Sequence, residues 1–228
     1  MKIKFLVLIC IACHKLNGQV DYTKYDQLLR SSVSSTGKVN YVWLKKNAAQ
    51  LNDLVNEINN TELLLTNPFD KKAYWINVYN VNTLQLIVDH YPLKSIMDLD
   101  GGKTWDIKRI KIGNKPYSLN QIENEILRKE FNDARIHFAL NCTASSCPPL
   151  LNEAYMAAKL EDQLDRQTRS FLLKSVVSKN NTITVSKLFE WYATDFVNIP
   201  AFINKYLPNT VPSTSKINYS EYDWKLNE

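Results

Sequence analysis

The chain has 228 residues, a formal net charge of +5 and 45% hydrophobic residues. It contains no block of five or more basic residues, so nucleic acid is not an expected partner. Its 5 glycines do not form a Gly-rich phosphate-binding loop, and there is no internal repeat or low-complexity segment.

The first 18 residues predict an export signal. Lys2 and Lys4 form a basic start, residues 5–13 are an unbroken apolar run, and a short polar stretch ends at Gly18. This is the order of a secretory signal, and the run is too short for a membrane span, which needs about 20 residues. We expect a mature chain that begins near Gln19.

Export has consequences for charge, location and cysteine chemistry. Residues 1–18 carry three lysines and no acid, so the remainder has 25 basic and 23 acidic residues. We expect residues 19–228 to form one secreted or periplasmic domain with no integral membrane span. A lipoprotein signal that ends at Cys13 is the alternative. Cys142 and Cys147 remain after cleavage, and in an oxidising compartment they are a candidate disulfide.

The first half of this domain predicts helices and one hairpin. Helices are expected over 22–33, 41–58 and 70–91. The third is the longest, and Pro92 stops it. Residues 105–112 alternate roughly between apolar and polar side chains, and the turn residues 113–116 follow, which predicts a hairpin.

The second half mixes helices and short strands. Ser118 can cap a helix over 119–131. Further helices are expected over 153–174, 189–196 and 200–206, strands over 136–140 and 182–185, and an extended tail over 217–226. Because the order has no βαβ rhythm, the predicted class is α+β, a single mixed domain with several helices around a small, mainly antiparallel sheet.

Five segments resemble the signatures of one protein family. They are 73–84 (AYWINVYNVNTL), 90–96 (HYPLKSI), 118–128 (SLNQIENEILR), 135–150 (RIHFALNCTASSCPPL) and 222–227 (YDWKLN). From these strings and their order, the chain is identified as a member of the domain of unknown function 547 family. The resemblance implies kinship and assigns no chemistry. Relatives often carry His directly after the glutamate of the third segment, where this chain has Asn124.

The first segment places amides in the middle of an apolar helix. Asn77, Asn80 and Thr83 lie three apart, on one side of the helix. One interpretation is a buried structural network in which every amide has a partner. The other makes Asn80 a group that stabilises a developing oxyanion, with Asn77, Trp75 and Tyr79 as substrate-binding residues.

The fourth segment suggests a thiol site. A cysteine nucleophile needs a base within reach, and His137 could serve Cys142 in that way. Asn141 or Glu123 would orient the imidazole. The leading hypothesis is therefore a thiol-dependent hydrolase or acyl transferase that acts on an amide or ester, without a cofactor.

Two alternatives for the same residues stay open. A Cys142–Cys147 disulfide would clamp the loop between them and leave a non-catalytic module that binds a small molecule or a peptide. Convergence of His90, His137 and a cysteine would instead favour a metal-dependent hydrolase, although the spacing is looser than that of zinc sites. Only four residues separate the cysteines, and the turn-prone sequence between them predicts that they approach closely enough to bridge.

Three further expectations concern the surroundings of His137. His90 either caps the end of its helix or joins the site. Arg135 is a natural partner for Glu123, and both are candidate site residues. We also predict that His137, Glu123 and Asn80 share one cleft.

Overall fold

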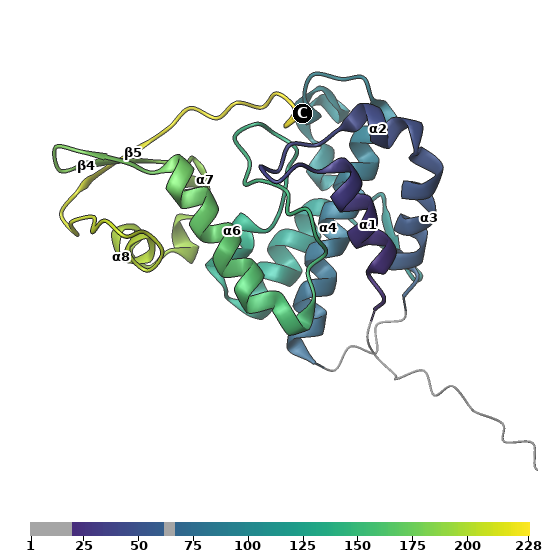
Figure 1. Ribbon diagram of the computed structural model, residues 1–228, viewed down its shortest axis with the longest axis horizontal. Helices are drawn as coiled ribbons and strands as arrows, with labels where there is room; N and C mark the ends of the chain where they lie inside the picture. The colour runs from purple at the N-terminus through teal and green to yellow at the C-terminus, as the bar shows by residue number, and fades with distance from the viewer. Residues whose placement is uncertain (1–19, 62–66) are drawn as a thin grey trace, which may run out of the picture.

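The computed structural model describes residues 20–61 and 67–228, and Figure 1 shows their arrangement. The predicted signal over 1–18 lies outside the described residues. The helices are α1 (Thr23–Ser32), α2 (Tyr41–Lys46), α3 (Ala48–Asn59), α4 (Pro68–His90), α5 (Arg128–Phe131), α6 (Leu160–Ser175), α7 (Leu188–Trp191) and α8 (Ile199–Asn204). A π-helix over Gln121–Leu127 precedes α5.

Five short strands form two small sheets in the described part of the chain. They are β1 (Ile110–Ile112), β2 (Lys115–Tyr117), β3 (Val177–Lys179), β4 (Thr182–Val185) and β5 (Lys216–Tyr219). The pairs β1–β2 and β3–β4 are antiparallel, whereas β5 runs parallel to β4. The predicted α+β class is confirmed, and the parallel β4–β5 pair makes the second sheet mixed.

Helix α4 is the centre of the larger core. Asn67 caps it by accepting a hydrogen bond from the Phe69 N–H, and Pro68 stands in the first turn, where its missing N–H costs nothing. The helix buries residues on all sides and packs against α2, α3 and the π-helix. A helix enclosed in this way has little water beside its middle turns, so its buried amides need partners within the protein.

A second core of phenylalanine rings fills the other end of the molecule. Phe138 lies 5.5 Å from Phe171 and 5.8 Å from Phe202, measured between ring centroids. These rings belong to the core cluster that includes Ile183 and Val185 of β4. The two cores meet at the segment around Phe138, which lies within the fourth family signature.

Residues 220–228, here called the C-terminal strap, run back from β5 to the α2 end of the molecule (Figure 1). The Leu226 N–H donates to the Lys94 carbonyl at 3.1 Å, and the Val39 N–H donates to the Asn227 carbonyl at 2.9 Å. The Ser145 N–H donates to the Lys225 carbonyl at 2.7 Å. The strap therefore joins the two ends of the fold and covers the loop that holds both cysteines.

Several predicted elements differ from the structure. Residues 136–140 are not a strand, because Asp133 accepts the Arg135 N–H at 3.0 Å and starts a 3-10 turn over Ala134–Phe138. The helix expected over 153–174 begins only at Leu160. The hairpin begins at Ile110 rather than at residue 105.

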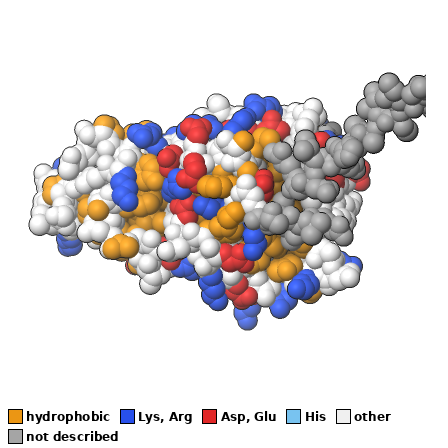
Figure 2. Space-filling model, turned by 90° about the horizontal axis from the view of Figure 1, so that it is seen from below, with side chains coloured by type: hydrophobic (Ala, Val, Ile, Leu, Met, Phe, Trp, Pro, Cys, Tyr) orange, Lys and Arg blue, Asp and Glu red, His pale blue; other side chains and the backbone are white. Residues whose placement is uncertain are grey.

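The surface carries mixed charge. Figure 2 shows acidic and basic side chains next to one another near the middle of one face, with hydrophobic side chains between them. The charges are paired locally: Arg135, for example, forms ion pairs with Asp133 at 2.8 Å and with Glu161 at 2.7 Å. Within the described residues, no helix has the length and apolar character needed to cross a membrane.

Candidate functional site

A cavity of about 190 Å³ lies where the π-helix, the cysteine loop, α7 and the strap meet. We call it the aromatic pocket. Its lining residues are Tyr79, Trp105, Asn120, Glu123, Asn124, His137, Leu140, Cys142, Cys147, Pro148, Leu188, Trp191, Tyr192, Tyr222 and Trp224. Larger hollows exist, but this one brings together the glutamate, histidine and cysteines that the sequence singles out.

The π-helix brings Glu123 into the pocket. Ser118 starts the turn by accepting the Gln121 N–H at 3.1 Å. Ile122 and Leu127 are both fully buried and lie five apart, which is the spacing of the hydrogen bonds in a π-helix. Glu123 is then carried inward and is only 7% exposed. Because π-helical turns are rare and occur often at functional sites, this one marks Glu123 as a functional candidate.

His137 lies at the floor of the pocket with its side chain fully buried. Its Nε2 atom lies 2.7 Å from Oδ2 of Asp195, and its ring stacks on Tyr192 with centroids 4.0 Å apart. The 3-10 turn over Ala134–Phe138 fixes the backbone beneath it. Stacking and the carboxylate together hold the imidazole in one orientation.

The surroundings of Asp195 define the tautomer of His137. Arg128 donates two hydrogen bonds of 2.6 Å to Asp195, and these bonds, together with the one from His137, lower the pKa of Asp195 to about 2. An ionised carboxylate only accepts, so His137 Nε2 must donate. Burial lowers the pKa of His137, so the ring is neutral near neutral pH. The proton is on Nε2 and the Nδ1 atom carries a lone pair.

The Nδ1 atom of His137 is buried and has no hydrogen-bond partner in the described structure. Oε1 of Glu123 lies 4.0 Å from it. No Lys or Arg nitrogen within the described residues lies within 4.0 Å of the Glu123 carboxylate. Burial, and then the negative charge of Glu123, raise the pKa values of Tyr79 and Tyr192, so both phenols stay protonated.

Cys142 and Cys147 form a disulfide with their Cα atoms 6.0 Å apart, which confirms the prediction that they can bridge. Both line the aromatic pocket. The strap holds the loop in place, since the Ser146 N–H donates to the Asp223 carbonyl at 3.2 Å. The Tyr222 hydroxyl lies 3.2 Å from the Cys142 sulfur.

Four aromatic rings form one continuous wall of the pocket. Trp224 contacts Tyr222, Trp105 and Trp191 at centroid distances of 4.7, 5.8 and 5.9 Å. Trp191 is 45% exposed, so it stands at the mouth. The rings come from three separate segments, so only the folded chain assembles this wall.

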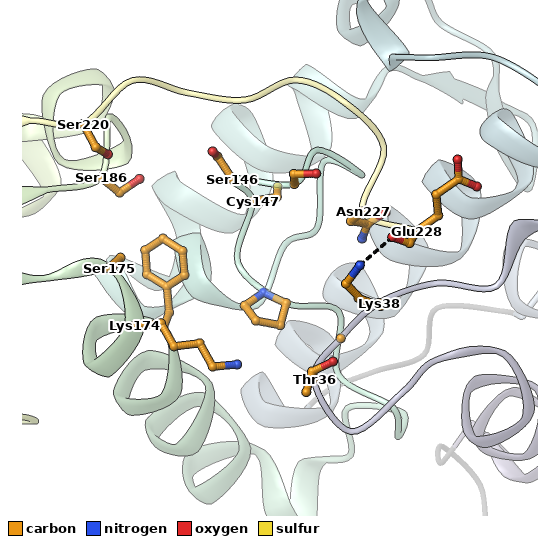
Figure 3. A pocket seen from close by; sticks show the side chains of 14 residues that line it. Thr36, Lys38, Ser146, Cys147, Lys174, Ser175, Ser186, Ser220, Asn227 and Glu228 are labelled. Carbon is orange, nitrogen blue, oxygen red and sulfur yellow. Dashed lines mark hydrogen bonds between the residues drawn. The ribbon is translucent and has the colours of Figure 1, made fainter.

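A second hollow of about 520 Å³ lies on the other side of the cysteine loop (Figure 3). Cys147 lines both hollows, so the loop is a wall between them. In Figure 3, Lys38 reaches the end of the strap and donates to the Glu228 carbonyl at 2.8 Å. The contact fastens the strap beside the loop.

The asparagines of α4 lie behind the pocket wall and do not line it. Asn77 donates to the Tyr155 carbonyl at 2.7 Å and accepts the Tyr155 N–H at 3.0 Å. Asn80 donates to the Ala139 carbonyl and accepts the Asn141 N–H, both at 2.9 Å. These residues hold backbone segments together. The predicted cleft therefore contains His137 and Glu123 but not Asn80.

Other candidates from the sequence also have partners elsewhere. The Asn141 amide donates to the Pro148 carbonyl at 2.8 Å. Trp75 packs edge-on against Tyr74 and Tyr117. Nδ1 of His90 lies 2.9 Å from the Leu86 carbonyl at the end of α4, away from the pocket lining.

Charged neighbours of the pocket are arranged differently from the expectation. Arg135 pairs with Asp133, Glu161 and Asp165, and Glu123 is not among its partners. Asn124, which follows Glu123 on the π-helix, accepts a hydrogen bond of 2.6 Å from Arg128. The described residues contain no group of three or more His, Cys, Asp or Glu placed to hold a metal ion.

Sequence reasoning missed Asp195, Arg128 and Tyr192. Asp195 lies 58 residues from His137, and no motif or spacing connects them. Tyr222 and Trp224 had a signal, because they belong to the last family segment, but nothing in the sequence placed that segment beside the cysteines.

The fold and the site define a single α+β domain with an aromatic pocket that has a histidine and a glutamate at its floor. Residues 65–172 match a family model described as protein of unknown function, DUF547, and the chain belongs to this family. The matched segment contains Glu123, His137 and both cysteines, whereas Asp195, Trp191 and the strap lie beyond it. No curated protein and no solved structure matches the chain.

Proposed function

We propose that this chain is a ligand-binding protein that holds a small molecule or the side chain of a peptide in the aromatic pocket while Cys142 and Cys147 are joined. The observation that carries the proposal is the disulfide itself. A sulfur in a disulfide has no thiolate to attack an amide or ester. Cys142, the candidate nucleophile, is therefore a structural part of the pocket wall. This favours a non-catalytic, ligand-binding function over a thiol enzyme.

The character of the pocket supports this function. Small-molecule sites are concave, mostly apolar and lined with aromatic rings around a few convergent polar groups. Here tryptophan and tyrosine rings form the wall, and His137 and Glu123 supply the polar floor. A volume of about 190 Å³ is smaller than the roughly 300–1,000 Å³ of sites for drug-sized ligands, so the ligand or its buried part is small.

The test is a fragment screen on the oxidised protein, read by thermal shift and by tryptophan fluorescence. A ligand that binds the native state alone raises the unfolding temperature with its concentration. Trp191→Ala should weaken binding at the mouth with little change in stability. Trp43→Phe, in α2 and outside the pocket lining, is the matched control. Failure to find any ligand, or equal affinity in Trp191→Ala, would contradict the proposal.

A thiol-dependent hydrolase or acyl transferase is the second candidate, for the reduced protein. It is favoured by the presence of Cys142 and His137 in one pocket, with Asp195 as the carboxylate that orients the ring.

Thiol titration separates the two functions. The ligand-binding proposal predicts no free thiol in the purified, unreduced protein. The thiol enzyme predicts rapid alkylation near neutral pH after mild reduction, slowed in His137→Ala. Thiols that stay inert after reduction would remove the second candidate.

The proposal includes export. Residues 1–18 have the basic, apolar and polar order of a secretory signal, and a disulfide suits an oxidising compartment. Intact mass of the exported protein should correspond to a chain that starts near Gln19 or Val20. A mass that includes Met1 to Gly18 would contradict it.

A further inference from the structure

We infer that the ligand of the aromatic pocket carries a protonated primary or secondary amine, which binds between Glu123 and His137. The inference rests on the proposed ligand-binding function and names the chemical class of the ligand. Charge, hydrogen-bond capacity and the aromatic wall each support it.

The charge of Glu123 lacks a partner. Its side chain is 10% exposed, and no Lys or Arg nitrogen of the described residues lies within 4.0 Å of it. Arg128, the cation near the floor, donates to Asp195 and Asn124 instead. Buried charges in proteins are paired, because an isolated one loses its hydration without compensation. A cation in the pocket supplies the missing partner.

The hydrogen-bond capacity of the floor is that of two acceptors. His137 presents the Nδ1 lone pair, which has no partner, and Glu123 presents Oε1 at 4.0 Å from it. One nitrogen at about 2.9 Å from each acceptor fits between them. A primary or secondary ammonium can donate to both at once. A neutral alcohol can donate to only one, and a quaternary ammonium to neither.

The aromatic wall suits the rest of such a ligand. Burial, followed by the charge of Glu123, raises the pKa of Tyr222, as it does those of Tyr79 and Tyr192, so the rings around the carboxylate are neutral. Ring faces attract cations, and they also cover the alkyl groups attached to the nitrogen. An anionic ligand would instead meet the Glu123 carboxylate and be repelled.

Calorimetric titration of the oxidised protein with four probes of similar size tests this inference. The probes are n-butylammonium, tetramethylammonium, 1-butanol and butyrate. We expect n-butylammonium to bind at least about tenfold more tightly than 1-butanol or tetramethylammonium, because it alone satisfies both acceptors and the charge. Butyrate should not bind.

Two variants test whether the preference for the amine depends on Glu123. Glu123→Gln should abolish the preference for n-butylammonium over 1-butanol, whereas Glu125→Gln, exposed on the same π-helix, should retain it. If Glu123→Gln does not fold, the comparison of the four probes on the unaltered protein still decides. An alcohol or butyrate that binds as tightly as the amine overturns the inference and leaves a ligand pocket in place. The inference alone fails if no probe binds while the fragment screen finds ligands, and both proposals fail if neither experiment finds one.

Discussion

Two buried polar clusters lie within one fold, and they differ in whether their groups have partners. Asn77 and Asn80 of α4 each donate one hydrogen bond and accept one, all with backbone groups at 2.7 to 3.0 Å. At the pocket floor, His137 leaves a ring nitrogen without a partner and Glu123 lacks a cation. Buried polar groups that are fully paired act in structure, whereas unpaired ones are candidates for function.

The largest expected effect concerns the asparagine cluster. Asn80→Ala leaves the buried Ala139 carbonyl and Asn141 N–H without partners, and each unpaired group costs about 1–3 kcal/mol. We expect a loss of about 3 kcal/mol in the free energy of unfolding, measured by urea denaturation. Asn52→Ala, exposed on α3, should change it by less than about 0.5 kcal/mol. Equal stability of the two variants would contradict the structural role.

The second-largest effect on stability is expected for the disulfide, which forms part of the pocket wall. Closing a loop of this size in the unfolded chain contributes about 2 kcal/mol by the chain-entropy relation. We expect the double variant Cys142→Ala and Cys147→Ala to lose about that much, and reductant to cause no further loss in it. The account of the wall would fail if reductant left the stability of the unaltered protein unchanged.

A pH effect distinguishes the floor from the asparagine cluster, which does not titrate. Burial lowers the pKa of His137 below 6.5, so the unfolded chain binds more protons as the pH falls through that value. The contribution of the neutral His137 ring to the free energy of unfolding is fully present above pH 6.5 and is lost as the pH falls below that value. His137→Gln should therefore flatten the decline in the free energy of unfolding as the pH falls below about 6.5. His90→Gln, exposed at the end of α4, should keep the decline. An unchanged decline in His137→Gln would count against a buried neutral ring.

The smallest effect on stability is expected for Glu123→Gln. The variant keeps the shape of the side chain and removes a buried charge without a cation partner. We expect the free energy of unfolding to stay the same or to rise by up to about 1 kcal/mol, in contrast to Asn80→Ala. A loss greater than about 2 kcal/mol, by the same urea measurement, would make Glu123 a structural residue.

The sequence predicts the parts of this molecule that depend on local patterns. Helix α4 is expected over 70–91 with its end at Pro92, and strand β4 is expected over the residues 182–185 that it occupies. The π-helix could not be predicted, because Ile122, Ile126 and Leu127 also fit an ordinary α-helix, and only packing selects the five-residue repeat.

The sequence also predicts only some of the residues of the candidate site. Glu123, His137 and Cys142 follow from their chemistry and from the family segments. Asp195 depends on how the segment after α7 packs against the 3-10 turn, which no local pattern encodes. The sequence also could not show whether Asn80 and Arg135 belong to the site or have a structural role, because it does not reveal whether a side chain has a partner.

The central claim is that the pocket floor presents two acceptors to a ligand: the Nδ1 atom of His137, which has no hydrogen-bond partner, and the carboxylate of Glu123, which has no cation beside it among the described residues. The most direct measurement is the nitrogen-15 NMR spectrum of the His137 imidazole in the oxidised protein near neutral pH, assigned with His90→Gln. The account predicts a protonated Nε2, an unprotonated Nδ1, and a shift of the Nδ1 resonance when n-butylammonium is added. A protonated Nδ1, or an Nδ1 resonance that saturating amine leaves unmoved, would contradict it.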